Sequence, residues 1–201
     1  MQNQTIHLEG LDLAGKSTIA SLLASNLGAV HRRNSLIEGN LLHQRAEVMR
    51  KNKIIDDEAL SWVYYACMLI DIERYRSPIM PCIQDSTIIL RSLAYNKAKG
   101  NHELADVFEE KLSIHPRFSL TVVLSSSNEV RLKRLEGRIS RGNDNPEDYI
   151  IRNNPKLFNA MNDCLSEYAM RYFNAVIINT SKLEQEGEKE KCVSEILRIL
   201  K

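Results

Sequence analysis

Residues 10–18 read G-L-D-L-A-G-K-S-T and fit the phosphate-loop pattern G-x-x-x-x-G-K-[ST]. The loop lies between a short apolar run at 5–8 and an apolar-periodic segment, which is the strand–loop–helix setting that the pattern requires. Gly10 and Gly15 allow positive φ and a close approach to a polyphosphate, whose oxygens accept hydrogen bonds from backbone N–H groups and from the helix N-terminus. The sequence therefore predicts a nucleoside-triphosphate site.

The residues that follow the second glycine strengthen this prediction. Lys16 is expected to bridge the β- and γ-phosphates, and the Ser17 hydroxyl to bind magnesium. The dinucleotide fingerprint G-x-G-x-x-G is absent, so a dinucleotide site is not predicted. The predicted nucleotide-binding residues are Gly10, Leu11, Asp12, Leu13, Ala14, Gly15, Lys16, Ser17 and Thr18.

Charge and composition exclude several classes of protein. The 201 residues include 27 Lys plus Arg and 26 Asp plus Glu, a net charge of +1, which argues against a general nucleic-acid or membrane-surface binder. The chain has 43% apolar residues, no signal-peptide pattern and no apolar window of membrane-spanning length. The four cysteines form no C-x-x-C pair. We expect one cytoplasmic domain over residues 1–201 with reduced cysteines.

The order of apolar segments predicts an α/β fold. Strand-type runs lie at 5–8, 29–31, 80–84, 120–124 and 176–178. Helical patterns lie at about 16–27, 36–50, 57–76, 103–113, 127–138, 147–173 and 187–200. Because strands that alternate with helices pair in parallel through crossover connections, we expect a parallel sheet covered by helices on both faces.

Three carboxylates are candidates for work beside the phosphate loop. Asp12 lies inside the loop and is expected to bind magnesium through water or to orient an acceptor, the alternative being a local turn bond. Asp85 ends an apolar strand, so it is expected at the same sheet edge, where it holds magnesium or takes the acceptor proton. A helix cap is the alternative for Asp85. Glu9 directly precedes the loop.

Arginines gather in the segment 131–141. Arg131, Arg134 and Arg138 fall at i, i+3 and i+7 on one helical face, and Arg141 leads into the polar stretch R-G-N-D-N-P-E-D. Guanidinium groups suit the charge of a transferring phosphoryl group. We therefore predict an arginine-rich lid over about 134–148 that excludes water, a solvated basic face being the alternative for each arginine taken alone. The predicted catalytic residues are Asp12, Lys16, Asp85, Arg134, Arg138 and Arg141, with Ser17 and Asp85 on the metal.

Four segments together resemble the thymidylate kinase-like nucleoside and nucleotide kinases. They are E-G-L-D-L-A-G-K-S-T at 9–18, the strand that ends at Asp85 with S-L-A-Y-N at 92–96, the arginine-rich segment, and V-I-I-N-T-S at 176–181. The resemblance implies a three-layer P-loop kinase fold with a five-stranded parallel sheet, ATP with Mg²⁺ as donor, and a nucleoside or its monophosphate as acceptor. It also suggests a homodimer and places residues 179–182 beside the adenine.

The chain departs from this family around the acceptor. Ser86 stands where the resemblance leads us to expect an arginine, and Arg91 is the nearby substitute. The segment H-R-R-N-S at 31–35 replaces an R-E-P-G-G type sequence, so that Arg32 or Arg33 would take its part. Tyrosines of the segment 57–76 are candidates for stacking on a base, with core packing an equal alternative. The predicted acceptor-binding residues are Glu9, Arg33, Tyr64, Tyr65, Arg91 and Tyr95.

Three functions remain open on the sequence. The arginines near 32–33 and Arg91 favour a nucleoside monophosphate of the dTMP type as acceptor, because they provide charge for a second phosphate. Ser86 favours the alternative, a kinase acting on a nucleoside or another small alcohol. The third is a nucleotide-dependent switch without a small-molecule acceptor, which the lack of a guanine-reading N-K-x-D motif disfavours.

Overall fold

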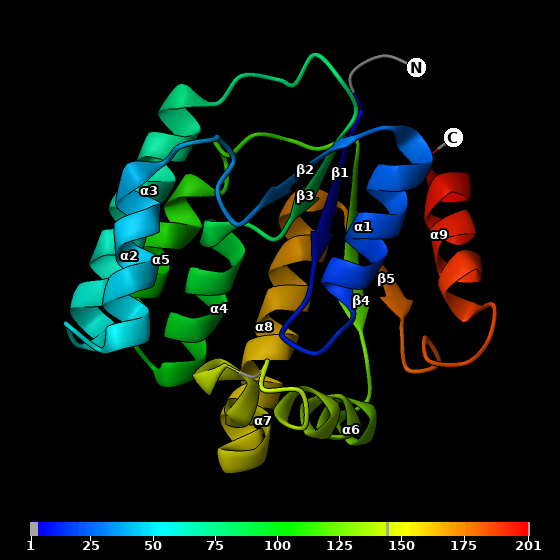
Figure 1. The fold of residues 1–201 in the computed structure, drawn as a ribbon. Helices are drawn as coiled ribbons and strands as arrows, with labels where there is room; N and C mark the ends of the chain where they lie inside the picture. The colour runs from blue at the N-terminus through cyan, green and yellow to red at the C-terminus, as the bar shows by residue number, and fades with distance from the viewer. Residues whose placement is uncertain (1–3, 144, 201) are drawn as a thin grey trace.

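A single parallel sheet organises the chain. The computed structural model describes residues 4–143 and 145–200. The sheet has five parallel strands in the order β2-β3-β1-β4-β5. The strands are β1 (Thr5–Glu9), β2 (Val30–Arg33), β3 (Cys82–Asp85), β4 (Leu120–Ser125) and β5 (Val176–Asn179). Their carboxyl ends point to the end of the molecule where α6 and α7 lie, at the bottom of Figure 1.

Helices connect the strands and cover both faces of the sheet. They are α1 (Lys16–Leu27), α2 (Leu41–Asn52), α3 (Asp57–Arg74), α4 (Ile88–Lys99), α5 (His102–Lys111), α6 (Asn128–Ile139), α7 (Ile150–Asn153), α8 (Pro155–Phe173) and α9 (Glu188–Ile199), with a 3₁₀ turn at Pro146–Tyr149. No helix in the described ranges is long and apolar enough to cross a lipid bilayer. Residue 144 of the predicted lid, and residues 1–3 and 201 of the predicted domain, lie outside the described residues.

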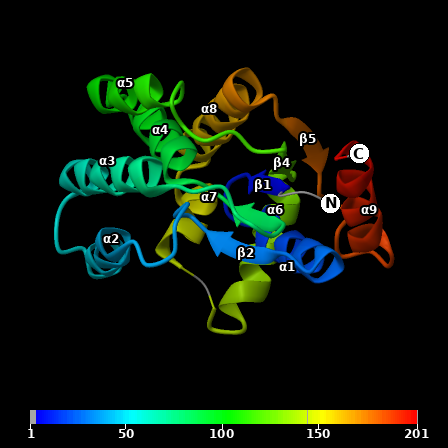
Figure 2. The same ribbon diagram turned by 90° about the horizontal axis from the view of Figure 1, so that it is seen from above.

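The layers of the fold enclose two apolar cores. On one face, Ile6 and Leu8 of β1 share a fully buried cluster with Leu23 of α1 and with α9. On the other face, Val123 of β4 belongs to a cluster with Leu93 of α4 and with α8. Figure 2 shows the sheet between α1 and α9 on one side and α4 and α8 on the other. The predicted three-layer α/β fold with a five-stranded parallel sheet is confirmed.

One helix was missing from the prediction. Helix α4 follows β3 after a two-residue junction and ends at Gly100, which has φ 81°. Half of its residues are buried, including the run Ile88–Leu90. The helix begins with this short apolar run directly after a buried strand, and a short apolar run cannot be assigned to a helix or a strand by periodicity alone.

Two predicted helices have different limits in the structure. The helix expected at 147–173 is wrong as one element, because it divides into the 3₁₀ turn, α7 and α8. Asn154 separates α7 from α8 and accepts a hydrogen bond from the backbone of Leu157, while Pro155 occupies the first helical position. The helix expected at 36–50 begins at Leu41, after the capping residue Asn40.

A buried carboxylate fixes the loop between β2 and α2. Asp71 of α3 is 1% exposed and accepts hydrogen bonds from Ser35 Oγ at 2.6 Å, Leu36 N at 2.8 Å and Asn40 Nδ2 at 2.8 Å. Hydrogen bonds to a buried charged group are stronger than those between neutral groups. The segment that leaves the carboxyl end of β2 is therefore held against α3.

We expect Asp71→Ala to lower the free energy of unfolding by about 3 kcal/mol, because it leaves three buried donors without their acceptor. Urea denaturation measures this loss. The matched control is Glu73→Ala, which removes an exposed carboxylate from the same helix and is expected to change stability by less than about 0.5 kcal/mol. Equal losses in the two variants would contradict the role given to Asp71.

Candidate active site

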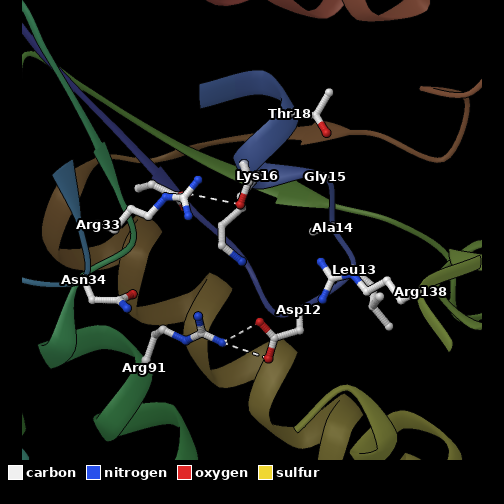
Figure 3. Close-up of a pocket in the computed structure, with 12 residues that line it drawn as sticks. Asp12, Leu13, Ala14, Gly15, Lys16, Thr18, Arg33, Asn34, Arg91 and Arg138 are labelled. Carbon is white, nitrogen blue, oxygen red and sulfur yellow. Dashed lines mark hydrogen bonds and ion pairs between the residues drawn. The ribbon is translucent and has the colours of Figure 1, made fainter. Parts of the chain in front are cut away.

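A cavity of about 230 Å³ lies at the carboxyl ends of the central strands. Residues 12–18 form one wall, and the other lining residues are Arg33, Asn34, Asp85, Arg91 and Arg138 (Figure 3). The walls therefore come from the loop after β1, from the ends of β2 and β3, and from helices α4 and α6. Ligands of open parallel sheets bind at this edge.

The backbone of the phosphate loop needs its glycines. Gly10 has φ 134°, and a Cβ there would lie 2.4 Å from the carbonyl oxygen of Leu124. Gly15 has φ 89°, and a Cβ would lie 2.7 Å from Leu183 Cδ1. Leu13 between them also takes a positive φ of 66°. The loop is thus a tight turn in direct contact with β4 and with the chain after β5.

Three side chains hold the loop from outside the cavity. The carbonyl oxygens of residues 12, 13 and 14 accept hydrogen bonds from Arg131 Nη1 at 2.6 Å, Arg134 Nη1 at 2.8 Å and Thr180 Oγ1 at 2.7 Å, respectively. None of these three side chains is among the residues that line the cavity. Because consecutive carbonyls are tied on the outer side, the curvature of the loop is set before any ligand enters.

Lys16 lies against the loop itself. Its Nζ donates to the carbonyl oxygens of Gly10 at 2.6 Å and Leu11 at 3.2 Å, and the residue is 8% exposed. Burial lowers the pKa of Lys16, and the nearby positive charge of Arg91 lowers it further, while neighbouring carboxylates oppose the change. The ammonium group of Lys16 therefore lies against the loop. A bound phosphate would replace the two carbonyl oxygens as its hydrogen-bond acceptor.

An ion pair crosses the cavity from the loop to α4. Arg91 Nη2 lies 3.0 Å from both carboxylate oxygens of Asp12 (Figure 3). Burial alone would raise the pKa of Asp12, but Arg91 and then Lys16 hold it well below its usual range. The charge of Asp12 in turn raises the pKa of Arg91. Both groups remain charged at neutral pH.

The two predicted metal ligands lie next to each other. Asp85 Oδ2 is 3.4 Å from Ser17 Oγ, 3.6 Å from His31 Nε2 and 3.9 Å from Arg33 Nε. A hydroxyl and a carboxylate oxygen are ligands of the kind that Mg²⁺ prefers, and Mg²⁺ commonly completes its shell with water and substrate phosphates. The oxygen donors present therefore fit a magnesium ion bound with a nucleotide.

Glu9 lies beneath the cavity and outside its lining. It is fully buried, and its carboxylate accepts hydrogen bonds from Gly10 N at 3.1 Å, Ser86 Oγ at 2.7 Å and Thr87 N at 3.0 Å. These bonds tie the start of the phosphate loop to the junction between β3 and α4. The structure thus places Glu9 in contact with the junction, where it holds Ser86 at a φ of 69°.

The three tyrosines predicted at the acceptor lie outside the cavity lining. Tyr64 donates to Glu47 at 2.5 Å, and Tyr95 donates to a carboxylate of α3 at 2.9 Å. Tyr65 meets Phe108 edge to face, with ring centroids 5.4 Å apart. These contacts join α3 to α2, α4 and α5.

The predicted lid arginines occupy different places. Arg138 lines the cavity and pairs with Asp148 at 2.7 and 2.9 Å. Arg134 lies behind the loop, where it also binds Glu184 at 2.6 Å. Arg141 is exposed and is not in the cavity lining. Of the three lid arginines predicted to be catalytic, Arg138 lines the cavity and the other two do not.

Two contributions were not predicted from the sequence. Asn34 lines the cavity directly after β2 and has φ 58°. Asn34 follows the end of a strand and adjoins Arg33, and this position in the sequence could have indicated a residue of the site. Thr180 was predicted only as part of a segment beside the adenine, yet its hydroxyl holds the phosphate loop.

Comparison with known proteins identifies the fold. No protein-family model matches the sequence, and no curated protein matches it. Thymidylate kinase from Ehrlichia chaffeensis is similar with a TM-score of 0.68 and 16% identity over 100% of both chains. Thymidylate kinase from Candida albicans has a TM-score of 0.66 and 19% identity over 100% of this chain and 94% of its own.

A nucleoside kinase is similar to nearly the same degree. Deoxyadenosine kinase from M. mycoides, solved with bound dATP, has a TM-score of 0.63 and 14% identity over 97% of this chain and 100% of its own. At these identities the likeness shows the fold. The chain therefore has the P-loop kinase fold that thymidylate kinases and deoxyadenosine kinase share.

The ion pair of Asp12 predicts an acid-dependent loss of stability. Because folding lowers the pKa of Asp12, its contribution is present above the unfolded pKa of about 3.9 and is lost as the pH falls below that value. We expect the wild-type chain to be more stable than Asp12→Asn at pH 7 and the difference to shrink below about pH 4. Urea denaturation across pH 2–7 measures it.

The control for this experiment is Asp163→Asn, which removes an exposed carboxylate from α8. Its difference from the wild-type chain is expected to stay small across the series. A stability difference for Asp12→Asn that does not change with pH would contradict the ion pair.

Proposed function

We propose that the chain is an ATP-dependent kinase that phosphorylates a nucleoside monophosphate of the dTMP type. The observation that carries the proposal is one cavity that holds a phosphate loop, the Ser17–Asp85 pair and Arg91. The fold shared with thymidylate kinases and with deoxyadenosine kinase supports it. The homodimer implied by the resemblance stays a prediction, as do the cytoplasmic location and the single domain over residues 1–201.

The phosphate loop supports the assignment of the ATP site. We infer that residues 10–18 hold the phosphates of ATP and that Ser17 and Asp85 hold Mg²⁺. A bound Mg²⁺ neutralises charge on the phosphate oxygens. Lys16 leaves its two carbonyl partners for the β- and γ-phosphates. Since phosphoryl transfer depends mainly on positioning and charge stabilisation, a loop that is already curved lowers the cost of binding in the reactive geometry.

The charged side chains of the cavity support a phosphate-bearing acceptor. The cavity carries more cationic than carboxylate side chains, four against two, and these are Lys16, Arg33, Arg91 and Arg138 against Asp12 and Asp85. In the described part of the chain, Arg91 uses only Nη2 for hydrogen bonding, so Nε and Nη1 can bind an acceptor phosphate. Guanidinium forks suit phosphate oxygens. Asp85 takes the acceptor proton or stays on the metal, and Arg138 is the lid residue nearest to the transferring group.

A nucleoside kinase is the second candidate, and Ser86 favours it. The hydroxyl of Ser86 is bound to buried Glu9, and the residue is 1% exposed, so it offers no phosphate-binding charge after β3. Deoxyadenosine kinase is also among the structural neighbours. The acceptor of this candidate is a deoxynucleoside or another small alcohol.

Replacement of the loop lysine tests the donor site. We expect Lys16→Ala to lower the turnover number about 100- to 1000-fold while the circular dichroism spectrum stays that of the wild-type chain, because the variant loses charge aimed at the phosphates. Lys133→Ala on the exposed face of α6 is the charge-matched control and is expected to retain turnover. A folded Lys16→Ala variant with normal turnover would falsify the mechanism.

An ADP-release assay with MgATP tests the acceptor. The panel compares nucleoside monophosphates, dTMP among them, with the corresponding nucleosides. We expect turnover with monophosphates and the highest rate with dTMP. Turnover of the unphosphorylated compounds alone would replace this acceptor by a nucleoside. Slow hydrolysis that no acceptor stimulates would instead indicate a nucleotide-dependent switch.

A further inference from the structure

Arg131 is a buried cation without an anionic partner. It is 1% exposed, and in the ranges 4–143 and 145–200 no carboxylate forms an ion pair with it. Its nitrogen atoms donate to three neutral oxygens instead. Nε donates to Ser126 O at 3.0 Å, Nη1 to Asp12 O at 2.6 Å and Nη2 to Asn162 Oδ1 at 3.2 Å. Each of the three nitrogen atoms therefore donates a hydrogen bond to a neutral oxygen, and no carboxylate of the described residues lies within ion-pair distance of the charge.

Burial of such a charge is costly, so its retention calls for a compensating interaction. Burial lowers the pKa of Arg131 to about 10, although the more distant charge of Asp12 opposes this change, and the group stays protonated at neutral pH. The guanidinium lies over the ring of Phe158, with its carbon 5.1 Å from the ring centroid, a contact that stabilises a cation without cancelling its field. Its bond to the Asp12 carbonyl places the charge next to a residue that lines the cavity.

The residue type at position 162 distinguishes a structural role of Arg131 from an electrostatic one. A carboxylate at that position would pair with Nη2 and make a stronger bridge between α6, α8 and the loop. The amide gives a hydrogen bond and leaves the positive charge in place. Compared with a carboxylate at position 162, the amide makes a weaker bridge between the helices. It also leaves a stronger positive potential at the phosphate loop.

We propose that Arg131 is a positioning residue for the donor phosphates, which shapes the loop through the Asp12 carbonyl and keeps an unpaired charge behind it for the bound polyanion. The inference rests on the proposed function, since the polyanion is the phosphate chain of ATP. Arg131 does not touch the ligand and is distinct from Lys16, which faces the cavity. Its effect is expected on binding of the donor and not on binding of the acceptor.

The decisive variant is Asn162→Asp, which keeps Arg131 and supplies the missing carboxylate at the same position. Isothermal titration calorimetry of the full chain with MgATP is expected to show affinity lowered about fivefold to tenfold. The midpoint of thermal unfolding is expected to stay equal or rise, because the buried charge gains a partner. A merely structural role would give higher stability with unchanged affinity.

The matched control is Asn159→Asp, which adds the same charge to the exposed surface of the same helix. Its side-chain oxygen accepts a hydrogen bond from Asn128, which an aspartate can also accept. We expect its affinity for MgATP to stay within about twofold of the wild-type value, because solvent screens the exposed charge. Equal affinities in the two aspartate variants would overturn the inference.

A second variant, Arg131→Met, removes the charge and the loop contact together. If it folds, we expect the KM for ATP to rise at least as much as the dissociation constant does in Asn162→Asp, with the KM for the acceptor within about twofold of wild type. If it does not fold, Asn162→Asp still decides. Failure of the wild-type chain to bind MgATP would overturn the proposed function and this inference together, whereas normal wild-type binding with equal variants would overturn the inference alone.

Discussion

The phosphate loop depends on hydrogen bonds that reach its outer side. Three consecutive carbonyls, those of residues 12–14, are held by Arg131 and Arg134 of α6 and by Thr180 after β5. The order of the strands makes this possible. Because β4 and β5 lie on the same side of β1, the helix after β4 and the chain after β5 both reach the loop. A loop held in this way has lost its conformational freedom before a ligand binds, and the cost of ordering it is not taken from the binding energy.

A second constraint joins the two halves of the cavity. Buried Glu9 binds both the first amide of the loop and the junction between β3 and α4. The same junction places Asp85 beside Ser17, and the helix that follows it places Arg91 against Asp12. One carboxylate therefore fixes the position of the phosphate loop relative to α4, the proposed donor and acceptor sides of the cavity. The cationic surplus of the cavity, with charge behind the loop at Arg131, suits a ligand with several phosphates.

The features that the sequence predicted are those with a local pattern. The phosphate loop has fixed spacing, and the five strands are short apolar runs, so both were predicted in the right order. Helix α4 was missed because it begins with a short apolar run next to a buried strand, and periodicity alone does not assign such a run. Arg134 was assigned to a lid by its helical spacing, but its partners are 121 and 46 residues away. Helical periodicity shows which residues lie on the same face of a helix, but it does not show which distant carbonyl group a side chain binds.

We propose that the curved loop at residues 10–18 is a preformed site for MgATP. Hydrogen exchange followed by mass spectrometry, with and without MgATP, measures the change that binding causes in this loop. We predict that protection rises in peptides that cover residues 10–18 and changes little in those that cover α5 and α9, because backbone amides of the loop become hydrogen-bonded to phosphate. Unchanged exchange over residues 10–18 at saturating MgATP, or protection confined to other segments, would contradict a MgATP site in this loop.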